Sequence, residues 1–193
     1  MMSSSGGTVR YAVGGFYALL LTEASACAAR AAAAAKEGNV KSEVGAAASA
    51  VLAAAAACES YLSEFLARAE MFQVLDVDAL NTVRMERDAQ QQWKSLIKAR
   101  GAEFDFETST EYAQLGCLFQ LRNHIAHRNS RLEVRDSWPY RLADCAGQRT
   151  IPVTNGPFYD WAVVAYRHQV AEWAYTRAAK WLDLADRAIQ FTC

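Results

Sequence analysis

Apolar residues recur at helical spacing along most of the chain, and this pattern predicts five helices. Glycine follows the first and third of them at Gly38 and Gly101, as is typical of helix ends. Ser42 is the expected cap of the second helix, and Thr108 with Glu111 has the form of a capping box before the fourth. The helices are expected over about 15–36, 43–70, 78–99, 109–128 and 159–189.

The apolar positions within two of these helices predict which residues form the core. In the last helix the aromatic residues keep the same helical spacing as the aliphatic ones, so they are expected to be core residues and not a base-stacking surface. The expected core positions there are Val163, Tyr166, Val170, Trp173, Trp181 and Leu184. In the second helix they are Val51, Leu52, Ala55, Cys58, Leu62, Phe65 and Leu66.

The segment before the last helix has a different composition. Residues 130–158 hold all three prolines, two glycines and short alternating stretches, so we expect a long ordered loop insertion or a small hairpin there. Residues 1–9 are rich in serine and glycine and are expected to be disordered. Residues 10–193 then form one domain, with an all-α fold: an antiparallel up-and-down bundle of about five helices.

Composition agrees with a helical globular domain. Of the 193 residues, 52% are hydrophobic and 21% are charged, which excludes a disordered chain. The 38 alanines, against 10 glycines and 3 prolines, favour helix. A net charge of -1 argues against a polybasic nucleic-acid binder but leaves a local basic patch open.

The cysteines and the N-terminal region indicate a cytoplasmic protein without a membrane anchor. Five cysteines without a CxxC pair are interpreted as reduced thiols, and three histidines without ligand spacing argue against a metal site. Arg10, the apolar stretch 11–21 and Ala24–Ala26 resemble a signal peptide, but the helical pattern continues past that point. Glu23 interrupts the only long apolar stretch before it could cross a membrane.

The residue types that suit chemistry gather at the end of the fourth helix. Asn123 and His127 are four residues apart and therefore share a helix face, and Arg122 flanks them. An imidazole can take a proton from a ribose 2′-OH or give one at neutral pH, and a guanidinium matches the charge that develops on the phosphate. Because the nucleophile belongs to the RNA, this set of residues needs no metal or cofactor.

Glu59 in the second helix is a candidate fourth member of the site. It falls at the edge of an apolar face, where an acid needs a partner, and Arg122 is the expected one. Two interpretations of this pair stay open: an ordinary salt bridge between helices, or an acid that orients the catalytic arginine.

The distribution of charge draws attention to the same part of the chain. Residues 59–111 hold 11 acidic and 6 basic residues, a balance of -5, whereas residues 122–149 hold 6 arginines and 3 acidic residues, a balance of +3. The arginines either lie in a solvated loop or form a phosphate-binding rim around the histidine. Arg128 and Arg131, with His124, are the candidate substrate-binding residues.

The element Leu121–His127, with the sequence LRNHIAH, resembles the RNxxxH signature of the HEPN superfamily of all-helical domains. Ala57–Leu62, which contains Glu59, resembles a helix that often carries an acid in such domains. The resemblance implies a metal-independent endoribonuclease of a toxin–antitoxin or antiviral system, with two copies of the motif paired across a homodimer. By position, Arg122 and His127 would be catalytic, Asn123 supporting and Glu59 auxiliary; the resemblance assigns no role to His124 or Arg128.

The chain departs from one branch of that superfamily, in which a tyrosine two residues after the histidine is modified by a nucleotidyltransferase antitoxin. Asn129 stands at this position, so that form of regulation is not expected. Three functions remain: a ribonuclease that leaves 2′,3′-cyclic phosphate, a non-catalytic HEPN module that binds RNA, nucleotide or a regulatory protein, and a helical domain in which these residues only stabilise a helix end.

Overall fold

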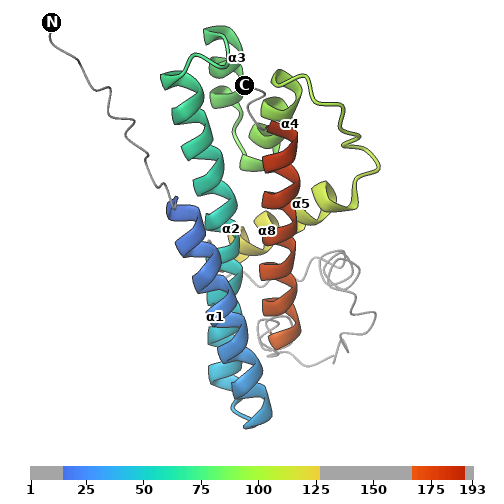
Figure 1. Ribbon diagram of the computed structural model, residues 1–193. Coiled ribbons are helices and arrows are strands. Elements are labelled where there is room, and N and C mark those ends of the chain that lie inside the picture. The colour runs from blue at the N-terminus through green and yellow to red at the C-terminus, as the bar shows by residue number, and fades with distance from the viewer. Residues whose placement is uncertain (1–14, 127–166, 190–193) are drawn as a thin grey trace, which may run out of the picture.

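The computed structural model describes residues 15–126 and 167–189, and every regular element in these ranges is a helix (Figure 1). The all-α fold class is therefore confirmed for the described residues. The predicted N-terminal disorder at 1–9 and the predicted loop or hairpin at 130–158 lie outside them. The helices are α1 (Phe16–Lys36), α2 (Val40–Met71), α3 (Val77–Met85), α4 (Ala89–Ala99), α5 (Thr110–Ala126) and α8 (His168–Ile189).

Helices α1 and α2 form a hairpin around a tight turn. Gly38 has a φ of 69°, a left-handed conformation that glycine adopts without the steric strain of a side chain. The cap of α2 is Asn39 and not Ser42 as predicted, because the Asn39 side chain accepts a hydrogen bond from the Ser42 backbone N–H at 3.1 Å. The helix therefore begins three residues earlier than the expected position 43.

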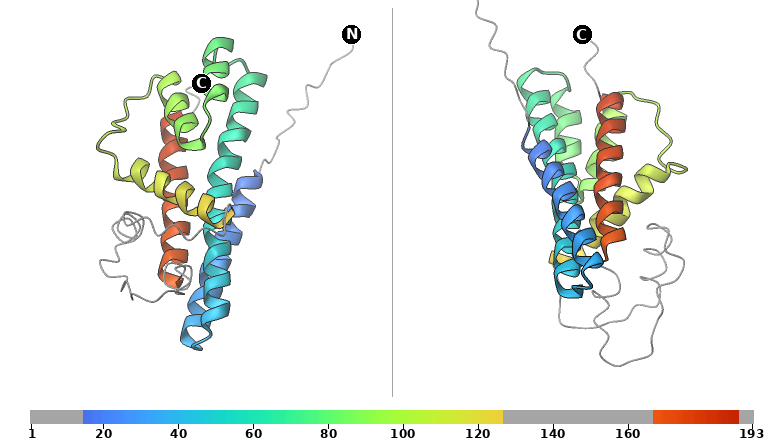
Figure 2. Two further views of the ribbon diagram at one scale, coloured as in Figure 1. Left: turned by 180° about the vertical axis from the view of Figure 1, so that it is seen from behind. Right: turned by 60° about the horizontal axis from the view of Figure 1, so that its bottom comes forward.

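Two contacts fix the relative directions of the longest helices. Glu43 near the start of α2 contacts His168 at the start of α8, and Tyr61, 18 residues further along α2, bonds to Asp186, 18 residues further along α8. These two helices therefore run in the same direction, while α1 runs antiparallel to α2. Helix α5 crosses α2 and α8 at a steep angle (Figure 2). The up-and-down bundle is thus not confirmed as a description of the described helices.

The third predicted helix, 78–99, is two helices. Glu86 is extended, with φ −63° and ψ 134°, and the Asp88 side chain starts α4 by accepting from the Gln91 N–H at 2.8 Å. The predicted start of the next helix is also shifted by one residue. Ser109, not Thr108, accepts from the Tyr112 N–H at 3.1 Å, so α5 begins at Thr110.

An aromatic cluster joins three helices at the centre of the core. Trp93 of α4 is fully buried, stacks on Tyr61 of α2 and meets Trp181 of α8 edge-on, with ring centroids 5.9 and 5.6 Å apart respectively. Val170, Trp173 and Trp181 are buried, as predicted for a core stripe, whereas Val163 and Tyr166 lie outside the described residues. One predicted core residue of α2 is exposed, since the Leu52 side chain is 37% accessible.

Both helices of the hairpin are long and apolar enough to cross a membrane. Helix α2 is thus a second long apolar stretch besides the one that contains Glu23. Core helices of soluble proteins have the same composition. Ala24 and Cys27 of α1 are buried, so cleavage after Ala26 would remove part of the core packing. The cytoplasmic location stays a prediction.

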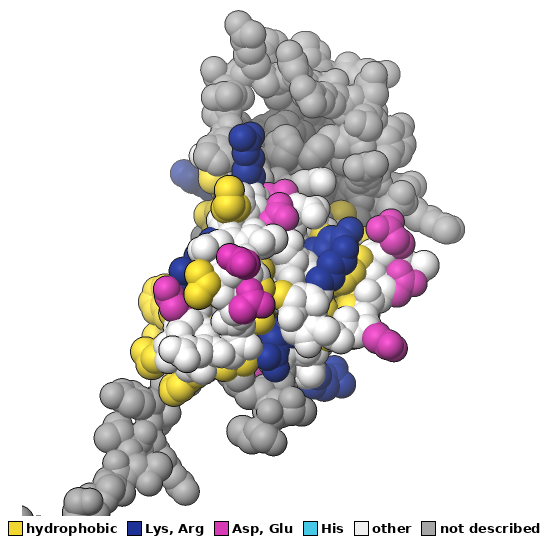
Figure 3. Space-filling model, turned by 90° about the horizontal axis from the view of Figure 1, so that it is seen from above, with side chains coloured by type: hydrophobic (Ala, Val, Ile, Leu, Met, Phe, Trp, Pro, Cys, Tyr) yellow, Lys and Arg dark blue, Asp and Glu magenta, His cyan; other side chains and the backbone are white. Residues whose placement is uncertain are grey.

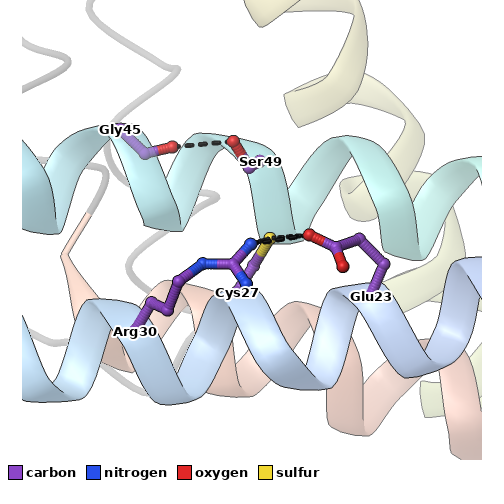
Figure 4. A network of polar contacts seen from close by, with 5 residues as sticks. All are labelled: Glu23, Cys27, Arg30, Gly45 and Ser49. Atoms are coloured by element: carbon purple, nitrogen blue, oxygen red, sulfur yellow. Dashed lines mark hydrogen bonds and ion pairs between the residues drawn. The ribbon is translucent and has the colours of Figure 1, made fainter.

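The thiols only partly follow the sequence-based expectation. Cys27 and Cys58 are free and buried, whereas Cys117 is disulfide-bonded, so the prediction of five reduced thiols was wrong for Cys117. Cys27 is more than a small apolar side chain. Its sulfur lies 2.9 Å from Arg30 Nη2 and 3.2 Å from Glu23 Oε1 (Figure 4). Burial, with the added effect of the Glu23 carboxylate, raises the pKa of the Cys27 thiol.

Two glycines should respond in opposite ways to alanine. A Cβ at Gly15 would lie 2.0 Å from Glu64 Oε2 and would disturb the carboxylate that accepts from the Tyr17 N–H at the start of α1. Gly45 within α2 has no heavy atom within 4 Å of such a Cβ. We expect Gly15→Ala to lower the free energy of unfolding by about 1–3 kcal/mol and Gly45→Ala to raise it by about 0.5–1 kcal/mol. Urea denaturation of both variants measures this, and equal effects would contradict the close approach at Gly15.

Candidate functional site

Packing of α5 determines where Arg122 lies. Leu118 and Leu121 are fully buried and Ile125 is packed against the core, as their spacing predicted. The helix therefore carries Arg122 at the boundary between core and solvent, with its side chain 27% exposed. Asn123, the next residue, is exposed.

The predicted partnership between α5 and α2 is confirmed. Arg122 Nη2 donates to Glu59 Oε1, and Arg122 Nη1 donates to Asn123 Oδ1 at 2.8 Å. One acceptor comes from a different helix and the other from the adjacent residue, so the guanidinium is held from two sides. The contact does not by itself distinguish a salt bridge from a catalytic orientation, because both interpretations require it.

Within the described part of the chain, the contacts of the guanidinium leave donors for a ligand. An arginine has five N–H donors, and the two contacts to Glu59 and Asn123 use one donor each of two different nitrogens. The remaining donors, on a side chain that is partly exposed, match the geometry of a phosphate oxygen pair. Glu59 is 36% exposed, so the ion pair lies at the surface and water can reach it.

Several predicted site residues lie outside the described residues. His127 follows Ala126, the last residue of α5, directly in the sequence, and Arg128 and Arg131 follow it. His124 belongs to α5, but its side chain is also outside the described part. The structure therefore brings together Arg122, Asn123 and Glu59 among the predicted site residues.

A second polar cluster, which the sequence analysis missed, lies where α2 and α8 begin. The carboxylate of Glu43 is buried and accepts from three donors: the His168 backbone N–H at 3.0 Å, His168 Nδ1 at 2.9 Å and Arg167 Nη2 at 2.9 Å. Because α8 starts at His168, this carboxylate lies at the N-terminal ends of two helices, where a negative charge is favoured. Its signal in the sequence is an acid on the same helix face as Ala47 and Ala50.

The hydrogen bonds to the Glu43 carboxylate determine its pKa. Burial alone would raise its pKa, but the hydrogen bonds from Arg167 and His168 outweigh burial and lower the pKa from 4.5 to about 2. Glu43 is therefore an anion throughout the physiological range. The contacts of Glu43 with Arg167 and His168 therefore hold the start of α8 against α2, and we call this group of residues the clamp.

Comparison with known proteins adds no assignment. No protein-family model, curated protein or solved structure matches the chain. Within residues 15–126 and 167–189, no three histidine, cysteine or acidic side chains come together as a metal site would require. The geometry of the arginine site is therefore the basis for a functional assignment.

Proposed function

We propose that the chain is a metal-independent endoribonuclease of the HEPN type, acting in the cytoplasm as a toxin or antiviral effector. The observation that carries the proposal is the position of the Arg122 guanidinium, which is partly exposed and is held by Glu59 and Asn123. Arg122 precedes His127 by five residues in the sequence. An arginine fixed in this way costs little further ordering when it binds a phosphate. We propose the HEPN-type bundle as the arrangement of the whole chain.

The proposed reaction uses groups of the RNA and of this chain only. A base, assigned to the His127 imidazole, removes the proton of the ribose 2′-OH, and O2′ then forms a bond to the adjacent phosphorus. The bond from phosphorus to O5′ breaks, O5′ takes up a proton, and the products are a 2′,3′-cyclic phosphate and a 5′-OH. The Arg122 guanidinium stabilises the charge that develops on the phosphoryl oxygens.

The remaining residues have supporting roles in this proposal. Glu59 and Asn123 are positioning residues, because each contacts Arg122 and thereby restricts where its guanidinium can point. Arg128, Arg131 and His124 are proposed to contact the RNA backbone. A homodimer would place two copies of the motif around one composite site, and a regulatory protein or antitoxin would restrain it.

One feature favours a second candidate function, a HEPN module that binds RNA, nucleotide or a protein without turnover. Arg122 already has a carboxylate partner, as a purely structural or binding arginine also would. This module would bind RNA through the same donors of Arg122 but would release it intact.

A cleavage assay separates the two candidates. We expect the purified full-length chain to cleave single-stranded RNA in the presence of EDTA, with products that end in 2′,3′-cyclic phosphate, because no step needs a metal. Mass spectrometry of the fragments identifies the end groups. RNA that is bound but left intact across varied sequences would support the binding module, and cleavage that EDTA abolishes would contradict the proposed mechanism.

A further inference from the structure

Large hydrophobic side chains are exposed where α2 ends and α3 lies. Met71, Phe72, Val77 and Met85 are 74%, 66%, 71% and 82% exposed. We call these four residues the α2–α3 corner. Of the eight large hydrophobic residues that are exposed in the described part of the chain, four fall within these 15 residues. Single exposed hydrophobic residues are ordinary, whereas a large contiguous group of them is typical of a surface that binds another molecule.

The ends of the two helices lie beside each other. Arg84 in the last turn of α3 donates through both terminal nitrogens to the carboxylate of Glu70 in the last turn of α2. This pair brings Met71 and Met85, the residues next to its members, to the same part of the surface. Helix α3 buries Leu80 and Val83 and leaves its outer side without a partner among the described residues.

The chemistry of the corner suits adaptable binding. Two of its four members are methionines, whose flexible side chains fit partners of varied shape. Two residues after the end of α2, and directly after Phe72, Gln73 has a left-handed conformation (φ 52°). Glycine is the usual residue for that conformation, so this turn is held at some conformational cost beside the exposed ring.

The segment that contains the corner is acidic. Residues 70–88 include five acids and two arginines, a net charge of -3, and one arginine, Arg84, is already paired with Glu70. Figure 3, which views the molecule from this end, shows hydrophobic and acidic side chains interspersed, with lysine and arginine side chains among them. The acidic members of the segment are Glu70, Asp76, Asp78, Glu86 and Asp88.

We propose that the α2–α3 corner binds a basic amphipathic helix of a partner protein. The apolar face of such a helix would cover the four exposed side chains, and its lysines or arginines would face the surrounding carboxylates. Charge complementarity selects this occupant. A symmetric contact between two copies of the chain would bring two surfaces of the same negative charge together, and an anionic membrane would be repelled in the same way.

Methionine signals give a direct test with the full-length chain. The chain has four methionines, Met1, Met2, Met71 and Met85, so methyl-labelled protein has two signals in the corner and two that serve as internal controls. The probe is a synthetic helical peptide with leucines on one face and lysines on the other. The comparison peptide has glutamates in place of the lysines.

We expect the lysine peptide to shift the Met71 and Met85 methyl signals and the glutamate peptide to leave them unchanged. Replacing both corner methionines by serine (Met71→Ser with Met85→Ser) should weaken binding, measured by fluorescence anisotropy, at least tenfold. The matched control replaces two exposed hydrophobic residues elsewhere, Phe16→Ser with Leu19→Ser on α1, and should change the affinity less than twofold. Raising the salt concentration should weaken the wild-type complex.

Several results would overturn the proposal. These are no binding of the lysine peptide, equal loss of affinity in the control variant, or equal binding of the glutamate peptide. A concentration-dependent dimer in sedimentation experiments that the serine substitutions abolish would assign the corner to a second copy of the chain. Because none of these measurements uses RNA, their outcome is independent of the proposed ribonuclease activity.

Discussion

Alanine at His127 or at Arg122 is expected to lower the rate of RNA cleavage at least ~100-fold, the usual scale for losing an acid–base group or a charge-stabilising donor. The His127→Ala variant loses the group that moves the proton, and the Arg122→Ala variant loses the donor that Glu59 and Asn123 hold in place. Single-turnover cleavage of a labelled RNA measures both rates.

Two controls make this result specific. Arg87→Ala removes an exposed arginine in the turn between α3 and α4 and should leave the rate within about twofold of wild type. Thermal denaturation of the His127→Ala variant should match wild type if the imidazole acts in catalysis and does not stabilise the helix end. An active His127→Ala enzyme, or a variant inactive only because it is unfolded, would contradict the catalytic assignment.

A substitution at Glu59 should distinguish its two interpretations, a salt bridge between helices and an acid that orients Arg122. Glu59→Gln keeps an acceptor near Arg122 but removes the charge, so the guanidinium is less firmly positioned. We expect the rate of cleavage to fall roughly 10- to 100-fold while the free energy of unfolding changes by less than about 1 kcal/mol, because the ion pair lies at the surface. A stability loss without a rate loss would leave only the salt-bridge interpretation.

Among substitutions of polar residues, we expect the one at Glu43 to lower the free energy of unfolding the most. Glu43→Gln removes the charge that three donors from the start of α8 surround. Because the pKa of Glu43 is about 2 in the folded chain and 4.5 is its ordinary value, the ionised carboxylate contributes about 3 kcal/mol at neutral pH. Urea denaturation should show a loss of this size.

The sign of the pH dependence follows from the direction of that shift. A carboxyl group with a lowered pKa in the folded state stabilises the protein above its unfolded pKa and loses this contribution as pH falls toward its folded pKa. The stability difference between wild type and Glu43→Gln should therefore be complete above about pH 5 and shrink between 4.5 and 2. Glu103→Gln, an exposed substitution outside the clamp, is the reference variant of this measurement, and a constant difference for Glu43→Gln would contradict the clamp.

The local chemistry of the sequence was enough to predict the central contact of the site. Leu118 and Leu121 had to face the core, which left Arg122 at its edge, and an acid at the edge of the apolar face of α2 needed a partner. The pairing of Arg122 with Glu59 follows from these two requirements, although 63 residues separate them in the chain.

Other features depend on contacts between distant segments that no local pattern contains. The break at Glu86–Asp88 was missed because the periodic pattern continues across it, while the Asp88 cap starts a new helix that places Trp93 between Tyr61 and Trp181. Glu43 was missed because the donors that stabilise it are 124 and 125 residues away, at Arg167 and His168.

By itself, the sequence determined the all-helical class, the extent of the first helix and the arginine at the boundary of the core, because periodicity and helix propensity act within a few residues. Only the tertiary structure decided that α8 runs parallel to α2, that α5 crosses both, and that four hydrophobic side chains of the α2–α3 corner stay exposed. These features depend on which faces pack together, since the free energy of burial is a property of pairs of elements and not of either one alone.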